Sequence, residues 1–99
     1  MREIKVYGTF YKTRGIGKRP VVYVDTSDDE LRHWRNENKL FTRWLERAHP
    51  VTGARCPVLY PPEKFVSRFK DGDSVIVKLG VRPEKRGLGM NTVDVSPGV

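Results

Sequence analysis

Apolar and polar residues alternate along the N-terminal segment EIKVYGTFYK, residues 3–12. This period of two is typical of a strand whose successive side chains point to opposite faces. One face carries the set that we expect to be buried: Ile4, Val6, Gly8 and Phe10. The other face is basic and aromatic: Lys5, Tyr7, Thr9 and Tyr11. Two alternatives are open for these tyrosines, because they can stack on nucleobases or pack beneath a helix with their hydroxyls in water.

A glycine-bearing turn follows at residues 12–19, and a second strand returns over 20–25. Gly15 and Gly17 permit positive φ, and we expect them to leave backbone N–H groups uncovered. The returning strand adds two valines to the core face and one tyrosine to the other: Val22, Val24 and Tyr23. The pattern predicts a β-hairpin whose tip carries four basic side chains: Lys12, Arg14, Lys18 and Arg19.

The period then changes to that of a helix. Ser27 and Glu30 form a capping box, and Pro50 ends the segment. Between them, apolar positions recur every three or four residues: Leu31, Trp34, Phe41, Leu45 and Ala48, with Asn38 in the same stripe. A basic stripe follows the same rhythm: Arg32, Arg35, Lys39, Arg43 and Arg47. We expect a helical insertion at about 28–48, either as one helix or as two that break at Asn36–Asn38, with helix over 39–48 in both cases.

The second half of the chain predicts strands around a brief helix. The expected elements are a strand over 56–60, a short helix over 62–69, a tight turn at 70–73, a strand over 74–82, a turn at 83–89 and a last strand over 90–97. Their inward side chains are expected to be Phe65, Val66, Phe69, Val75, Val77, Leu79 and Val81. The chain thus predicts a single domain over 1–99 of the α+β class, mainly β. It is either a small five-stranded OB-like barrel or a curled antiparallel sheet, with the helical insertion between strands 2 and 3.

The two predicted hairpins share a motif. Gly8, Arg14, Gly15 and Gly17 recur 72 positions later as Gly80, Arg86, Gly87 and Gly89. The repeat has two interpretations: shared turn stereochemistry, or two equivalent basic fingers that flank one groove. In OB-folds the loops between strands 1 and 2 and between strands 4 and 5 border the ligand site, and these are the two loops that carry the motif.

Composition points to a polyanionic partner. Lys and Arg number 19 against 12 Asp and Glu, and the net charge is +7. Phosphate contacts dominate nucleic-acid affinity, so such an excess on a small domain favours nucleic acid. Cys56 is the single cysteine, which excludes an internal disulfide and suits a reducing compartment. The sequence shows neither a membrane-spanning run nor a signal peptide, and we expect a cytoplasmic protein without membrane contact.

Catalytic motifs are scarce. His33 and His49 lie too far apart on the predicted helix to share a site, and they lack metal-ligand spacing. Helix capping accounts for most of the acidic cluster at Asp25, Asp28, Asp29 and Glu30. The sequence has no Walker A loop, no dinucleotide fingerprint and no nucleophile elbow. We therefore expect no enzyme activity, no cofactor and no metal.

The favoured function is non-catalytic binding of single-stranded DNA or RNA with little sequence specificity. The expected contacts are Lys5, Tyr7, Tyr11, Lys12, Arg14, Lys18, Arg19, Tyr23, Arg82, Lys85 and Arg86. One alternative is a duplex-binding dimer that uses the helix contacts Arg32, Arg35, Lys39 and Arg43. The other is a protein-interaction module without nucleic acid, anchored by Trp34, Phe41 and Trp44. A homodimer through the helical segment is compatible with each of these functions.

Overall fold

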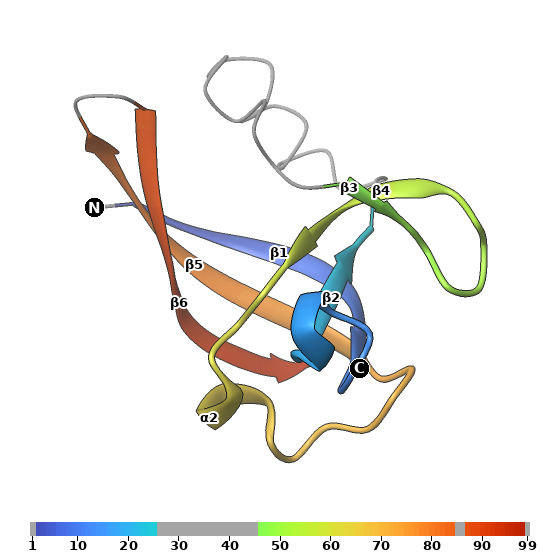
Figure 1. Ribbon diagram of the computed structural model, residues 1–99. Coiled ribbons are helices and arrows are strands. Elements are labelled where there is room, and N and C mark those ends of the chain that lie inside the picture. Colours follow the sequence, from blue (N-terminus) through green and yellow to red (C-terminus); the bar gives the residue numbers. More distant parts are fainter. Residues whose placement is uncertain (1, 26–45, 85–86, 99) are drawn as a thin grey trace.

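A computed structural model describes residues 2–25, 46–84 and 87–98 of the chain. The strands are β1 (Arg2–Tyr11), β2 (Val21–Val24), β3 (Glu46–Ala48), β4 (Arg55–Leu59), β5 (Ser74–Glu84) and β6 (Gly87–Pro97) (Figure 1). A 3₁₀ turn, η1 (Ile16–Lys18), lies between β1 and β2, and helix α2 (Glu63–Val66) lies between β4 and β5. These bounds confirm the predicted N-terminal hairpin and the predicted order of strands around a brief helix, although the helix is shorter than expected.

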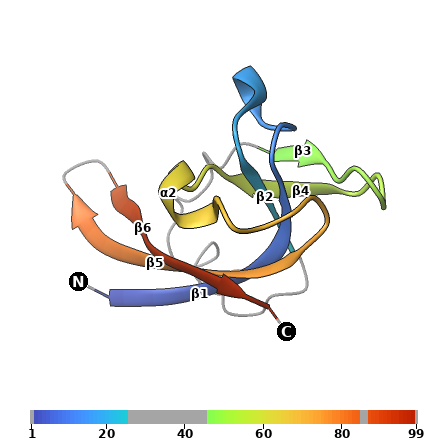
Figure 2. The same cartoon turned by 90° about the horizontal axis from the view of Figure 1, so that it is seen from below.

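The six strands form one antiparallel sheet in the order β3-β4-β2-β1-β5-β6. Among the described residues β3 and β6 are edge strands, so the sheet curls without closing into a barrel (Figure 2). The mainly β class is confirmed, and of the two predicted architectures the described strands agree with the curled antiparallel sheet.

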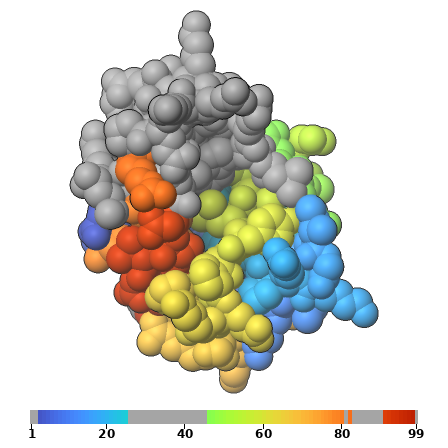
Figure 3. Space-filling view, turned by 60° about the vertical axis from the view of Figure 1, so that its left-hand side comes forward, coloured from blue at the N-terminus to red at the C-terminus, as the bar shows by residue number. Residues whose placement is uncertain are grey.

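The main core lies on the concave face of the curled sheet. It contains Ile4, Val6, Phe10, Val22, Val24, Val66, Phe69, Val75, Val77, Leu79 and Val95. The period-two pattern of β1 is thus confirmed on its buried side, and each such side chain stabilises the fold by roughly 1.5–3 kcal/mol. The segment around α2 covers this face and fills the space between β6 and the β1–β2 loop (Figures 2 and 3). Arg68 of this segment donates a hydrogen bond of 2.9 Å from Nη2 to the carbonyl of Val95 in β6.

A second, smaller cluster lies on the outer face of the sheet, opposite the main core. It contains Tyr11, Val21, Tyr23, Cys56 and Val58, with Tyr60 packed at its side. All four residues of β2 are buried as a result, because β2 contributes alternate side chains to each cluster. The strand pattern left open whether the tyrosines of this face are a stacking surface or are packed, and the cluster shows that Tyr11 and Tyr23 are packed.

The C-terminal end of the predicted helical insertion is a strand. Glu46–Ala48 pair with Arg55–Pro57 as β3 and β4, where the pattern predicted the last turn of a helix. Backbone hydrogen bonds from His49 N to Ala54 O and from Gly53 N to His49 O, both 2.9 Å, close the intervening loop. Gly53 has a φ of 72°, which suits this turn. Tertiary pairing therefore overrides helical periodicity at this end. The rest of the insertion, residues 28–45, lies outside the described residues.

The second hairpin is tighter than predicted. Its strands extend to the pair Glu84↔Gly87, so only residues 85–86 lie between them, where the pattern predicted a turn over 83–89. Residues 12–20, by contrast, separate β1 from β2. Gly87 and Gly89 lie inside β6, whereas Gly15 and Gly17 lie in the loop between β1 and β2. The two glycine motifs therefore differ in structure. The two tips also lie at opposite ends of β1, because β5 runs antiparallel to it from Thr9↔Ser74 to Arg2↔Val81.

A register shift between Lys78 and Leu79 adds one residue to β6 at Val93. Val95 is buried, while Val93 is 36 % exposed. The bulge thus separates two valines that the sequence pattern treated as equivalent.

Candidate nucleic-acid interface

The β1–β2 loop is held in a defined shape by its own backbone. Gly15 N donates to Arg19 O at 2.9 Å, and Lys18 N donates to Gly15 O at 3.0 Å. Gly15 is buried, and a Cβ at this position would meet Arg19 O at 2.6 Å and a ring carbon of Tyr60 at 2.7 Å. Gly15 is therefore required for close packing, and its N–H is already used, contrary to the expectation that it is uncovered. Gly17 does adopt the expected positive φ, at 69°.

Basic side chains from two separate segments meet at this loop. Arg47 of β3 donates a hydrogen bond of 2.8 Å from Nη1 to the carbonyl of Arg14. This contact brings a residue that the sequence placed on a helix beside the predicted hairpin tip. We call these two residues, together with the other basic residues of the β1–β2 loop, Lys12, Lys18 and Arg19, the basic patch; all are exposed except the half-buried Arg47. Such a concentration of like charges raises the local positive potential and attracts polyanions.

The three tyrosines predicted to share one stacking surface occupy different environments. Tyr11 and Tyr23 are 7 % and 3 % exposed, and their ring centroids lie 5.6 Å apart in an edge-to-face contact. The guanidinium carbon of Arg14 lies 5.4 Å from the centroid of the Tyr11 ring. Tyr11 and Tyr23 are therefore packed, as one alternative predicted, but against His49 of the β3–β4 hairpin and not beneath a helix. Tyr7 is 47 % exposed and available for stacking. The difference arises because the β3–β4 hairpin reaches only the end of β1 where Tyr11 lies.

A charged row that begins with two lysines, the basic row, lies next to Tyr7. Lys5 lies opposite Lys78 in the register of β1 and β5, and Lys78 lies opposite Asp94 of β6. Directly opposite residues point to the same face of a sheet, so the two lysines are neighbours on the outer face. The next row places Ile76 opposite Tyr7. Tyr7 therefore has an apolar neighbour on one strand and the basic row beside it.

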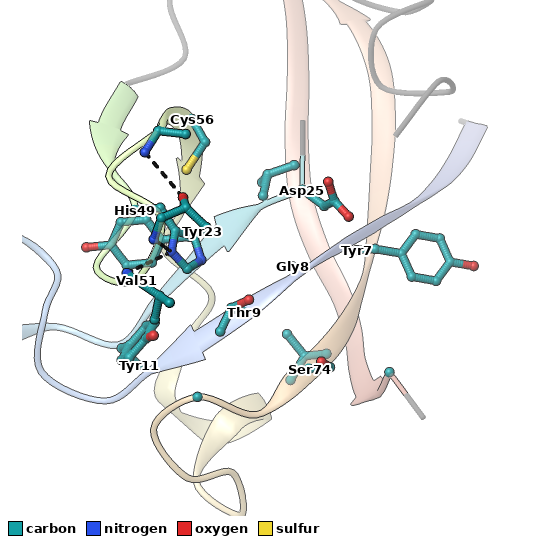
Figure 4. A pocket seen from close by; sticks show the side chains of 16 residues that line it. Tyr7, Gly8, Thr9, Tyr11, Tyr23, Asp25, His49, Val51, Cys56 and Ser74 are labelled. Atoms are coloured by element: carbon teal, nitrogen blue, oxygen red, sulfur yellow. Dashed lines mark hydrogen bonds between the residues drawn. The ribbon is translucent and has the colours of Figure 1, made fainter. Parts of the chain in front are cut away.

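The outer face is hollowed between the β3–β4 hairpin and the start of β5. This depression, which we call the groove, has a volume of about 700 Å³. Its described lining includes Tyr7, Thr9, Tyr11, Tyr23, Asp25, His49, Val51, Thr52 and Ser74. Figure 4 shows His49, Val51 and Cys56 on one side of β1 and Ser74 on the other, with Tyr7 projecting outward at one end.

His49 anchors the hairpin to the floor of the groove. Its ring centroid lies 5.5 Å from that of Tyr23 and 6.5 Å from that of Tyr11. Its Nδ1 accepts hydrogen bonds from the backbone N–H of Val51 at 3.1 Å and of Thr52 at 3.4 Å. These bonds fix the tip of the hairpin and so define one wall of the groove.

Comparison with protein families, with curated proteins and with solved structures found no match to this chain. The described helix is too short to span a membrane. The described residues also contain no group of three or more His, Cys, Asp or Glu side chains arranged to hold a metal ion.

The remaining predicted contacts are spread over the molecule. Lys5 is exposed on β1, and Arg82 is exposed near the far end of β5. The other predicted residues lie outside the described part of the chain: Arg32, Arg35, Lys39, Arg43, Lys85 and Arg86. Sequence reasoning missed Arg47 and His49 as parts of one surface, because their spacing fitted a helix. Pro50 and Gly53 did indicate a turn after that helix, but nothing in the sequence showed that the turn joins two paired strands.

Cys56 lines the groove but is buried. Burial raises the pKa of its thiol, and the nearby Glu46 carboxylate raises the pKa further. Its Sγ also lies 3.7 Å from the carbonyl of Arg47, where the thiol can donate a hydrogen bond. The thiol is therefore protonated at neutral pH and suited to packing.

Proposed function

We propose that this protein is a non-catalytic nucleic-acid-binding domain that prefers single strands and reads little sequence. The observation that carries the proposal is the basic patch, in which the hydrogen bond from Arg47 to the Arg14 carbonyl joins two segments of the chain. Phosphate neutralisation by such groups supplies affinity without base identity. The single buried Cys56 suits the cytoplasm as its compartment.

The fold supports the preference for single strands. When the short β3 is left out, the sheet order includes β4, β2, β1 and β5 as successive neighbours. The strand that follows α2 is β5, and it returns to lie beside β1. This is a Greek-key order, as in OB-like barrels, which bind single-stranded nucleic acid through a sheet face and its bordering loops. The exposed Tyr7 ring supplies the aromatic platform that such binding uses.

The test is a fluorescence-anisotropy titration of the full chain with a single-stranded oligonucleotide, at low and at physiological salt. A duplex and an RNA of equal length are titrated in parallel. We expect the single strand to bind more tightly than the duplex and the affinity to fall steeply with salt. Affinity that does not change with salt, or tighter binding of the duplex, would contradict the proposal.

Arg14→Glu and Lys64→Glu form a matched pair of variants. Both native side chains are exposed and stack on an aromatic ring, Arg14 on Tyr11 and Lys64 on Phe65, but only Arg14 belongs to the basic patch. We expect Arg14→Glu to weaken binding roughly ten-fold or more and to reduce the salt slope by about 1. Equal losses in both variants would indicate a general effect of charge.

A further inference from the structure

We propose that the groove receives the bases of the bound strand, while the basic patch and Lys5 hold its phosphates at the rim. This inference rests on the proposed function. It assigns the β3–β4 hairpin, which the sequence pattern did not predict, as one wall of the binding site. The groove is lined by the hairpin, by the outer faces of β1 and β2 and by the start of β5 (Figure 4).

The chemistry of the lining suits bases and disfavours phosphates. Among the described residues that line the groove, none is Lys or Arg, and the one charged side chain is that of Asp25. A carboxylate repels a phosphate but accepts hydrogen bonds from the N–H donors of bases, both the exocyclic amino groups and the ring N–H of thymine. The hydroxyls of Thr9, Thr52 and Ser74 can donate to or accept from any base edge, which agrees with binding that reads little sequence.

Exposed apolar side chains also line the groove. Four large apolar side chains are exposed among the described residues: Tyr7, Ile16, Val51 and Val93. Two of them, Tyr7 and Val51, line the groove, and Val51 is 78 % exposed. Exposed apolar residues grouped in a hollow mark a ligand site more often than scattered ones do. The face of a base is apolar and flat, and it can cover the Tyr7 ring.

Basic groups flank the groove at two points. Arg14 lies over the ring of Tyr11, which forms part of the floor, and so stands at the end of the groove next to the basic patch. Lys5 lies two residues before Tyr7 on the same face of β1, at the other end. A backbone that runs between these points keeps its phosphates near positive charge while its bases face the protein. β1 rises about 3.3 Å per residue, so the span from Lys5 to Tyr11 suits a short strand of a few nucleotides.

The decisive probe is an oligonucleotide that keeps the phosphates and lacks the bases. Anisotropy titrations compare an oligo-dT strand with an abasic strand of the same length and label. The native protein is expected to bind oligo-dT at least ten-fold more tightly than the abasic strand. Equal affinity for the two strands would overturn the base groove while leaving phosphate binding, and hence the proposed function, in place. Binding to neither strand would overturn both.

Variants then locate the base contact. Tyr7→Ala should weaken oligo-dT binding roughly 5- to 150-fold, the range that corresponds to loss of one stacked base, and leave the affinity for the abasic strand unchanged. Tyr7→Phe, which keeps the ring, should restore the affinity. Val51→Ala should cause a smaller loss that is also confined to oligo-dT, and Val93→Ala, an equally conservative change of an exposed residue outside the groove, should cause none. The three substituted positions are exposed, so thermal melting should confirm that each of the four variants folds.

Arg14→Glu distinguishes the loss of phosphate contacts from the loss of base contacts. It should weaken binding of the oligo-dT and abasic strands by the same factor, because it acts on phosphates. If Tyr7→Ala also lowered both affinities equally, Tyr7 would be acting on the backbone and the base groove would be wrong. If Tyr7→Ala lowered neither affinity, the bases would bind elsewhere and the groove would again be wrong.

Discussion

The two faces of the sheet carry clusters of different chemistry. On the concave face every member of the main core is aliphatic or phenylalanine, and the segment around α2 covers it. On the outer face the smaller cluster contains two tyrosines and a cysteine, and His49 packs against both tyrosine rings. The first face contributes stability alone. The second combines packing with polar edges beside a groove, which is the composition expected of a surface that also meets a ligand.

Strand β1 shows the contrast within one element. Phe10 is almost completely buried on the concave face, whereas Tyr7 is half exposed on the outer face. Both are large aromatic residues in the same alternating pattern. The difference shows that hydrophobic periodicity distinguishes the faces, but that the cover on each face decides how deeply a residue is buried.

The largest expected effect comes from the concave face. Phe10→Ala removes a ring that packs against Phe69 at a centroid distance of 6.0 Å and should lower the free energy of unfolding by about 3–5 kcal/mol. Tyr7→Ala, on the other face of the same strand, should lower it by less than about 1 kcal/mol. Urea denaturation of both variants measures the contrast. Similar losses would show that the outer face is as important for stability as the core.

The next largest effect is expected at Gly8, where the backbone of β1 lies close to β2. A Cβ on Gly8 would meet Tyr23 O at 2.5 Å and a methyl carbon of Val22 at 2.6 Å. Gly8→Ala should therefore lower the free energy of unfolding by about 1–3 kcal/mol, because β2 has to shift. Since β2 belongs to both clusters, we expect nucleic-acid affinity to fall as well. An unchanged melting temperature would indicate that β1 and β2 separate easily.

A smaller effect is expected where the hairpin joins the basic patch. Arg47→Met keeps much of the side-chain volume but removes the bond to the Arg14 carbonyl, and should lower the free energy of unfolding by about 0.5–1.5 kcal/mol. Its effect on phosphate affinity should be comparable with that of Arg14→Glu or somewhat smaller, since one charge is lost instead of reversed. Arg55→Met, which removes an exposed charge of the same hairpin from its pair with Glu46, is the control and should change both quantities little.

The smallest effect concerns pH. The pKa of Cys56 in the folded protein is raised above its ordinary value of 9.0, first by burial and then by Glu46. The unfolded chain therefore loses the thiol proton first, and the contribution of Cys56 to stability is present below pH 9.0 and lost as the pH rises above it. Unfolding free energies of the native protein and of Cys56→Ala, measured between pH 7 and pH 10, should converge in the alkaline range. A constant difference would contradict the raised pKa.

Much of the concave face could be predicted from the residues alone. Ile4, Val6 and Phe10 recur at even spacing in one strand, and Val75, Val77 and Leu79 do so in another, although the apolar Ile76 lies between the two valines. Period-two burial therefore identifies both strands and their inward sides. The turn at residues 70–73 was equally evident, and its Gly72 has a φ of 88°. The basic side chains of the β1–β2 loop were also identified, because loop residues with charge are expected to remain exposed.

The groove and the basic patch could not be predicted in the same way. Residues 46–48 have helical spacing in the sequence, and only pairing with β4 makes them a strand. That pairing brings Arg47 to Arg14 and His49 to Tyr23, contacts across 33 and 26 positions of the chain.

The sequence by itself determined which residues alternate, where the chain turns and how much positive charge it carries, because these depend on local sterics and on composition. The tertiary structure alone decided which tyrosines are covered and which basic residues share a surface. The burial of the tyrosines and the grouping of the basic residues both depend on contacts between distant segments of the chain. Those contacts contribute free energy only after the strands have paired.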